Sequence, residues 1–208
     1  MIVKLKRTDL DRPAEDVAPI LLGALLTHRT EAGAVCVRIT EVEAYGGVGT
    51  DPASHAHRGR TPRNTEMFAA PGTLYVYFVY GLHWCANIVC GPHGEASAVL
   101  LRAGEVTDGV MLARERRPSA RRDNDLARGP ANLAAALGIN GSMSGSDVIT
   151  GNSSVRLTGA KFGATALVDI ERGPRVGISQ AIDRPWRWWI TNDSTVSRYR
   201  GLCGDTPR

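Results

Sequence analysis

The sequence predicts a mixed α/β fold in one domain. Helical patterns occur at residues 13–22, 107–117 and 130–137, and strand patterns lie between and after them. The clearest strand pattern is an aromatic hairpin signal at residues 73–89. No internal repeat occurs, and strands and helices do not alternate regularly, which argues against a doubly wound sheet. With 208 residues the chain can form one sizeable core, so we expect a single domain over residues 1–208.

The first predicted helix covers residues 13–22. Pro13 suits the first turn of a helix, where its missing N–H has no helical partner, and Gly23 stands where a C-cap is expected. The apolar stripe is formed by Val17, Ile20 and Leu21. Pro19 is unfavourable inside the helix because it removes one backbone hydrogen bond.

The first predicted strand covers residues 34–45. Apolar residues at every second position from Val35 to Ile39 share one face, and Glu41 and Glu43 join that face if the alternation is unbroken. A carboxylate at Glu43 is then partly desolvated, which raises its pKa and suits it to act as a base. The alternative for Glu43 is a solvated acid at the end of a strand.

Two aromatic and β-branched strands, residues 73–79 and 83–89, flank a turn at Gly81. The register of this hairpin decides which side chains share a face. A two-residue turn places Tyr77 opposite Trp84, whereas a three-residue turn pairs position 79 with position 83. The three-residue turn gathers two rings, a thiol and an amide in one pocket below a projecting tip: Tyr75, Tyr77, Cys85 and Asn87 in the pocket, Tyr80 and Leu82 at the tip. The alternative is an ordinary aromatic sheet core.

The remaining predicted elements are short. Pro118 ends the helix at 107–117, and Gly129 and Gly138 flank the helix at 130–137. Further strands are predicted at residues 99–102, 155–157, 175–179 and 186–190. Residues 139–154 are rich in glycine and serine and are predicted to form a flexible loop.

Arginine carries most of the positive charge. The net charge is +4, and only three of the 25 basic residues are lysine. The flat guanidinium fork of arginine suits phosphates and base edges, although a GC-rich genome produces the same enrichment. Four scattered cysteines form no disulfide framework, the N-terminus has no apolar leader, and no segment reaches transmembrane length. We therefore expect a cytoplasmic protein that spans no membrane.

Two basic patches are candidates for phosphate binding. Arg58, Arg60 and Arg63 form a basic loop without an acidic residue among positions 58–64. Residues 112–128 carry six arginines against three acidic residues, and a solvated surface explains this second patch equally well.

No cofactor or metal site is expected from the motifs. The glycine-rich residues 46–49 are not a dinucleotide fingerprint, because the position of the third glycine is Pro52 and no helical pattern follows. His83, Cys85, Cys90 and His93 match no standard zinc spacing, and strand alternation separates their side chains.

Taken together, these motifs resemble the alkyladenine (3-methyladenine) DNA glycosylase family. The resemblance runs from about residue 13 to about residue 191 and is densest between residues 41 and 102. The matching segments are Glu41-Val-Glu-Ala-Tyr45, Ser54-His55, Arg60-Thr-Pro-Arg-Asn64, Met67-Phe68, Pro71-Gly-Thr-Leu-Tyr-Val-Tyr77, Tyr80-Gly81, Asn87, Val99-Leu-Leu-Arg102 and Gly129-Pro-Ala-Asn-Leu133.

The resemblance implies a single compact mixed α/β domain on a curved antiparallel sheet, with surrounding helices and a protruding hairpin that enters the DNA minor groove. It implies a DNA repair enzyme that flips alkylated purines out of duplex DNA and hydrolyses the N-glycosidic bond. The expected substrates are 3-methyladenine and 7-methylguanine, with hypoxanthine and ethenoadenine handled by some members. A monomer associated with the nucleoid is expected.

The resemblance also implies roles for individual residues. Glu43 activates water and Arg102 helps to position it. The flipped base is held by Tyr45, His55, Tyr77 and Asn87, with Asn87 crowding the amino group of normal guanine. Because Tyr77 and Asn87 must reach the same pocket, the resemblance also implies the three-residue hairpin turn. At the hairpin tip Tyr80 is the wedge, and Leu82 and His83 stand where relatives often have a longer apolar residue and an aromatic. The expected phosphate contacts are Arg58, Arg60 and Arg63.

A single carboxylate suffices for this chemistry when the leaving base is already cationic, as N3- and N7-alkylated purines are. Cleavage of the strand by a lyase needs an amine nucleophile, and Lys4, Lys6 and Lys161 all lie outside the motif region. We therefore expect a monofunctional glycosylase that leaves an abasic site. The alternatives are a non-catalytic protein that binds damaged DNA on the same fold, and a hydrolase acting on RNA or nucleosides.

Overall fold

One antiparallel sheet of nine strands runs through the residues that the computed structural model describes, which are 4–79, 81–159 and 169–199. Its strands are β1 (Leu25–Thr30), β2 (Gly33–Tyr45), β3 (Leu74–Val79), β4 (His83–Val89), β5 (Ala98–Asp108), β6 (Ala127–Arg128), β7 (Val155–Thr158), β8 (Ile170–Gly173) and β9 (Arg187–Ile190). The main path is β3–β4–β5–β2–β1–β7, while β6 pairs with β5 and the β8–β9 pair joins β2. All these pairings are antiparallel, as the resemblance implied.

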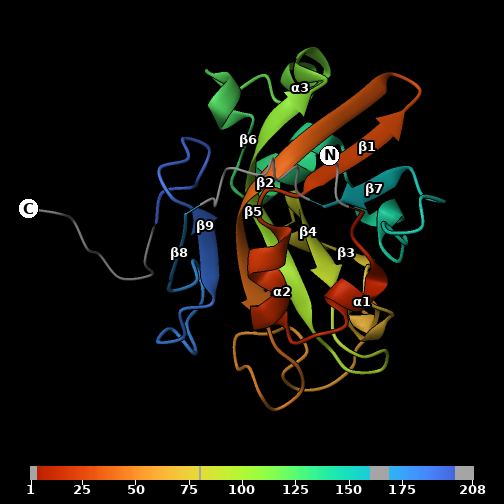
Figure 1. The fold of residues 1–208 in the computed structure, drawn as a ribbon, viewed down its shortest axis with the longest axis vertical. Helices are drawn as coiled ribbons and strands as arrows, with labels where there is room; N and C mark the ends of the chain where they lie inside the picture. The colour runs from red at the N-terminus through yellow and green to blue at the C-terminus, as the bar shows by residue number, and fades with distance from the viewer. Residues whose placement is uncertain (1–3, 80, 160–168, 200–208) are drawn as a thin grey trace, which may run out of the picture.

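Short helices pack against this sheet, which confirms the mixed α/β class. They are α1 (Arg7–Leu10), α2 (Ala14–Leu21), α3 (Val110–Arg116), α4 (Pro130–Leu137) and the 3-10 turns η1 (Thr65–Phe68), η2 (Asp123–Asp125) and η3 (Gly141–Met143). The α2 helix contacts β2 and β5, and α4 contacts β4 and β5. Figure 1 shows the loops between β2 and β3 gathered at one end of the molecule, opposite α3. None of the helices in the described ranges is long and apolar enough to cross a membrane.

Most predicted elements are confirmed, and the differences have physical causes. The helix predicted at 107–117 begins only at Val110, because β5 continues to Asp108. Gly109, with φ 73°, separates the two, and a Cβ there would lie 2.1 Å from the carbonyl oxygen of Ala34. The strand predicted at residues 175–179 is wrong, since the strand of that region is β8. The β1 strand was not predicted.

The alternation along β2 is broken in its middle, so the expected single face is wrong. The main apolar core contains Val35, Val37 and Ile39, and after them Val42 and Ala44. The core-facing positions are therefore odd-numbered before residue 40 and even-numbered after it. The glutamates at positions 41 and 43 consequently lie on the opposite face from the core-facing residues.

A shift in the register of pairing between β2 and β5 causes this change of face. Ile39 pairs with Gly104 and Val42 pairs with Leu101, with register shifts between them. Such a shift leaves an unpaired residue that turns the following side chains to the other face. It brings Glu41, Glu43 and Arg102 together on one side of the sheet.

The segment predicted as a flexible loop, residues 139–154, is irregular apart from η3 and packs against the hairpin. Ile139 and Val148 are buried, and the backbone N–H of Gly145 donates to the carbonyl of Leu74 at 2.8 Å. At Gly141 an added Cβ would lie 2.6 Å from the ring of Trp84. This segment therefore packs against β3 through Leu74 and against β4 through Trp84.

We expect Gly141→Ala to lower the free energy of unfolding by about 1–3 kcal/mol, because the added methyl group overpacks against a rigid indole. Trp84 also contacts Phe78, with ring centroids 4.6 Å apart and planes tilted by 43°, so the displacement should reach the hairpin tip. Thermal unfolding and affinity for duplex DNA measure the two effects. Ser142→Ala, at an exposed neighbouring position, is the control. Equal behaviour of the two variants would contradict the supporting role.

Candidate active site

A cavity of about 470 Å³ lies between the end of β2, the β3–β4 hairpin, the loop of residues 53–67 and residues 176–178. We call it the aromatic cavity and define it by Tyr45, His55, Tyr75, Tyr77, Cys85 and Asn87. It is the place where most of the predicted site residues come together.

The hairpin has the three-residue register. Val79 pairs with His83, Tyr77 with Cys85, and Tyr75 with Asn87. The two-residue alternative is therefore wrong. The three-residue turn places all four side chains predicted for one pocket along the aromatic cavity.

Three aromatic rings meet in the cavity. The His55 and Tyr77 centroids are 4.6 Å apart with an interplanar angle of 82°, and Nδ1 of His55 lies 3.1 Å from the hydroxyl of Tyr75. Burial, with a smaller effect from Arg63, lowers the pKa of His55, which keeps the imidazole neutral at pH 7. Burial raises the pKa of Tyr75 to about 12, so its hydroxyl stays protonated.

Asn87 and Cys85 form the floor contributed by β4. Asn87 is buried, and its amide nitrogen donates to the carbonyl of Tyr75 at 3.0 Å, which holds the amide in one orientation. Burial raises the pKa of the Cys85 thiol, so it is a neutral lining group.

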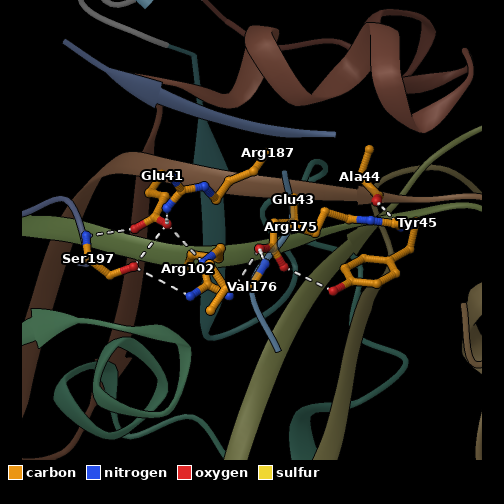
Figure 2. A network of polar contacts seen from close by, with 9 residues as sticks. All are labelled: Glu41, Glu43, Ala44, Tyr45, Arg102, Arg175, Val176, Arg187 and Ser197. Atoms are coloured by element: carbon orange, nitrogen blue, oxygen red, sulfur yellow. Dashed lines mark hydrogen bonds and ion pairs between the residues drawn. The ribbon is translucent and has the colours of Figure 1, made fainter. Parts of the chain in front are cut away.

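Glu43 is a buried carboxylate beside the cavity, and each of its oxygens has a partner (Figure 2). The backbone N–H of Val176 donates to Oε1 at 2.7 Å, and the Tyr45 hydroxyl donates to Oε2 at 2.9 Å. Arg102 lies 3.2 Å from Oε1. Burial raises the pKa of Glu43 against the opposing effect of Arg102. The prediction of a desolvated carboxylate with a raised pKa is confirmed, and the solvated alternative is wrong.

Arg102 bridges two buried carboxylates. Its Nε donates to Oε1 of Glu41 at 2.9 Å, while Nη1 faces Glu43. Glu41 also accepts from Arg187 at 3.0 Å and from the backbone N–H of Ser197 at 2.8 Å. Figure 2 shows Arg102 between the two glutamates, with Ser197 and Arg187 around Glu41. The orientation of Arg102 is thus determined from both sides.

Two of the predicted tip and groove residues, Leu82 and His83, do not line the cavity. Leu82 is 73% exposed and His83 is exposed, as expected for side chains that meet DNA. The predicted wedge, Tyr80, lies outside the described residues.

The three loop arginines predicted to bind phosphate differ in their surroundings. Arg58 and Arg60 are exposed, and Arg60 lies over the Phe68 ring at 5.6 Å. Arg63 is exposed too but reaches the cavity, where its guanidinium lies 5.9 Å from the Tyr77 ring centroid.

The second basic patch, at residues 112–128, is largely paired within the protein. Arg114 forms an ion pair with Asp123, and Arg122 and Arg128 both pair with Asp125. Three of its six arginines are therefore neutralised by acids of the same patch, which favours the alternative of a solvated surface over phosphate binding.

Nothing in the described ranges groups three or more His, Cys, Asp or Glu side chains so that they could hold a metal ion. The groups that line or adjoin the cavity include Arg102, the aromatic rings and the carboxylate of Glu43.

Comparison with known proteins decides the family. The family model described as methylpurine-DNA glycosylase (MPG) matches residues 8–194. The chain belongs to the methylpurine-DNA glycosylase family. A Streptomyces avermitilis protein named "Putative 3-methyladenine DNA glycosylase" is 50% identical, covering 98% of this chain and 94% of the relative. Proteins of the same name from Cutibacterium acnes and Burkholderia lata are 51% and 47% identical, covering 91% and 93% of this chain and 97% and 90% of the relatives.

The resemblance found in the sequence is thereby confirmed, and in this member of the methylpurine-DNA glycosylase family the six residues predicted for catalysis and base binding meet at one place. They are Glu43, Tyr45, His55, Tyr77, Asn87 and Arg102. Sequence reasoning missed Glu41, Arg175, Val176 and Ser197 as parts of this site. Only Glu41 carried a local signal, because two glutamates one residue apart on a strand share a face. The others are far away in sequence.

Proposed function

We propose that the protein is a monofunctional DNA glycosylase that removes 3-methyladenine and other alkylated purines from duplex DNA. The observation that carries the proposal is the desolvated Glu43 carboxylate beside the aromatic cavity, linked to its wall by the hydroxyl of Tyr45. Family membership and the names of the relatives support the choice of substrate.

The target base must leave the duplex before it can enter the cavity, at a cost of roughly a few kcal/mol. Tyr45 and His55 are proposed to stack on the two faces of the flipped purine, with Tyr77 at its edge. Tyr80 and the exposed Leu82 are proposed to fill the gap left in the duplex, which offsets part of the cost. Arg58, Arg60 and Arg63 are proposed to hold the phosphates.

Charge explains the preference for alkylated purines. A cationic N3- or N7-alkylated purine is a good leaving group without a proton donor. The depressed pKa of His55 keeps its ring neutral, so it stacks on a cationic base without repulsion. The buried amide of Asn87 is proposed to exclude normal guanine by crowding its amino group.

Glu43 is proposed to be the general base that activates water for attack on the sugar. A raised pKa makes its carboxylate a stronger base, and Arg102 favours the ionised form that the reaction needs. Because each carboxylate oxygen has two acceptor lone pairs, Oε2 of Glu43 can accept from the attacking water while it also accepts from the Tyr45 hydroxyl. The ionised carboxylate also stabilises the oxocarbenium-like sugar.

The test is a panel of duplexes that carry 3-methyladenine, 7-methylguanine, hypoxanthine or ethenoadenine, scored for release of the free base. We expect release of the cationic bases and an intact strand until alkali or an abasic-site nuclease is added. Strand nicking by the protein alone would contradict a monofunctional enzyme. Lesion binding without release would indicate a non-catalytic protein that binds damaged DNA. Faster release from RNA or free nucleosides than from duplex DNA would indicate a hydrolase that acts on RNA or nucleosides.

A further inference from the structure

The pair formed by Arg175 and Asp51 is the most deeply buried ion pair beside the aromatic cavity. Nη1 of Arg175 lies 2.6 Å from Oδ2 of Asp51 and Nη2 lies 2.8 Å from Oδ1, and neither side chain has exposed surface. We propose that Arg175 is a positioning residue for excision, which sets the Tyr45 ring and the Val176 N–H against Glu43. This role rests on the proposed function.

The pair joins three segments that border the cavity. Arg175 itself lies in the segment leading to residues 176–178, and its Nη1 also donates to the carbonyl of Ala44 at 2.9 Å, at the end of β2. Asp51 accepts from the backbone N–H groups of Gly46 at 3.0 Å and Ala53 at 3.2 Å, and so holds the loop that leads to His55. The hydrogen bonds of Arg175 lower the pKa of Asp51 although burial opposes this, so the pair stays charged.

Arg175 also supports the Tyr45 ring directly. Its guanidinium carbon lies 4.8 Å from the Tyr45 centroid and 5.2 Å from that of Trp186, within the range of a cation–π contact. Figure 2 shows Arg175 next to Ala44 and Tyr45 on the side of Glu43. This contact orients the ring so that its hydroxyl reaches Oε2 of Glu43.

The residue after Arg175 supplies a hydrogen bond to the proposed base. Val176 donates its N–H to Oε1 of Glu43 at 2.7 Å, and Val176, Gly177 and Ile178 line the cavity. A donor to a carboxylate stabilises the ionised form and lowers its pKa, which counteracts the desolvation. Anchoring of Arg175 therefore controls both a stacking wall and the protonation of Glu43.

Stability alone is a weak reason for such a pair. Desolvating two charges can cost as much as their attraction returns, and apolar replacements of buried pairs are often neutral or stabilising. The fork geometry of arginine, which lysine lacks, instead fixes the relative positions of the three segments.

The test compares Arg175→Lys with Arg184→Lys. Arg175→Lys keeps the charge beside Asp51 but loses the fork, whereas Arg184 lies 4.8 Å from the Trp186 centroid and belongs to no part of the proposed site. We expect Arg175→Lys to slow single-turnover release of 3-methyladenine about 10- to 100-fold, with little change in duplex affinity. The acidic limb of its pH–rate profile should move to higher pH, because Glu43 loses a well-placed donor. Arg184→Lys should match the wild type in all three.

A wild-type acidic limb in a folded Arg175→Lys variant would overturn the proposal, even if the rate fell together with stability. If Arg175→Lys does not fold, Asp51→Asn loosens the same fork from the other side and must shift the limb in the same direction, otherwise the proposal is wrong. Failure of the proposed function is a different result, because the wild type itself would then release no base from any duplex.

Discussion

Replacing Glu43 by glutamine is expected to slow excision of 3-methyladenine by a factor of about 10²–10⁴, the usual contribution of a general base. The amide keeps the shape and one acceptor oxygen for the Val176 N–H, but it cannot take a proton from water. Single-turnover release at saturating enzyme measures the loss. Binding to a lesion duplex should persist, which separates a lost chemical step from a lost site.

The same substitution should change stability in a way that depends on pH. The pKa of Glu43 is raised by burial, so ionisation is less favourable in the folded chain than in the unfolded chain. The stability contributed by the protonated carboxyl is present below the ordinary pKa of about 4.5 and is lost as the pH rises through the raised pKa. The melting temperature of Glu43→Gln relative to the wild type should therefore increase with pH across that range.

The control is Glu95→Gln, the same chemical change at an exposed position. It should affect neither excision nor the pH dependence of melting. Excision by Glu43→Gln at the wild-type rate would remove Glu43 from the mechanism. The wild type itself should lose activity as the pH falls through the raised pKa of Glu43, because only the ionised form accepts a proton.

Replacing Glu41 by alanine is expected to lower the free energy of unfolding by about 3–5 kcal/mol, the cost of removing one partner of a buried ion pair. Arg102 and Arg187 are both buried and both donate to Oε1 of Glu41. Without this carboxylate, two guanidinium groups remain in the interior with fewer acceptors. For a chain of this size the melting temperature should fall by roughly 6–20 °C.

Excision should fall as well, because Arg102 loses the partner that orients it toward Glu43. Glu105→Ala is the matched control: Glu105 pairs with Arg38 at 2.8 Å, but its side chain is 48% exposed. Loss of such a surface pair costs about 0–1 kcal/mol. A similar loss of stability in the two variants would show that Glu41 is not the centre of the buried network.

Local signals account for much of the fold. The α4 helix lies between Gly129 and Gly138, as predicted, because proline at the first turn and glycine in the left-handed region act within a few residues. The predicted hairpin at Gly81 is confirmed as well, because its turn signal also acts within a few residues. The residue pattern alone was compatible with both turns, and the three-residue register that the family resemblance requires is the one in the structure.

The side of the sheet on which Glu41 and Glu43 lie could not be predicted from the alternation of apolar residues along β2. Val35 to Ile39 form a regular pattern, but the register shift between β2 and β5 reverses it before Glu41. Whether a strand contains such an irregularity depends on the strand beside it, which is distant in the sequence. The consequence is chemical, because the shift moves Glu43 away from the main apolar core and toward the aromatic cavity.

The sequence by itself determined the mixed α/β class, most of the elements, the family, and six residues that meet at the cavity. Only the tertiary structure decided how Glu43 is held. Its partner Val176 lies 133 residues away, and Ser197 lies 156 residues from Glu41. Local periodicity contains no information about such contacts, because burial and hydrogen bonding of a carboxylate arise when distant segments close over it. The pKa of the proposed base is therefore a property of the fold.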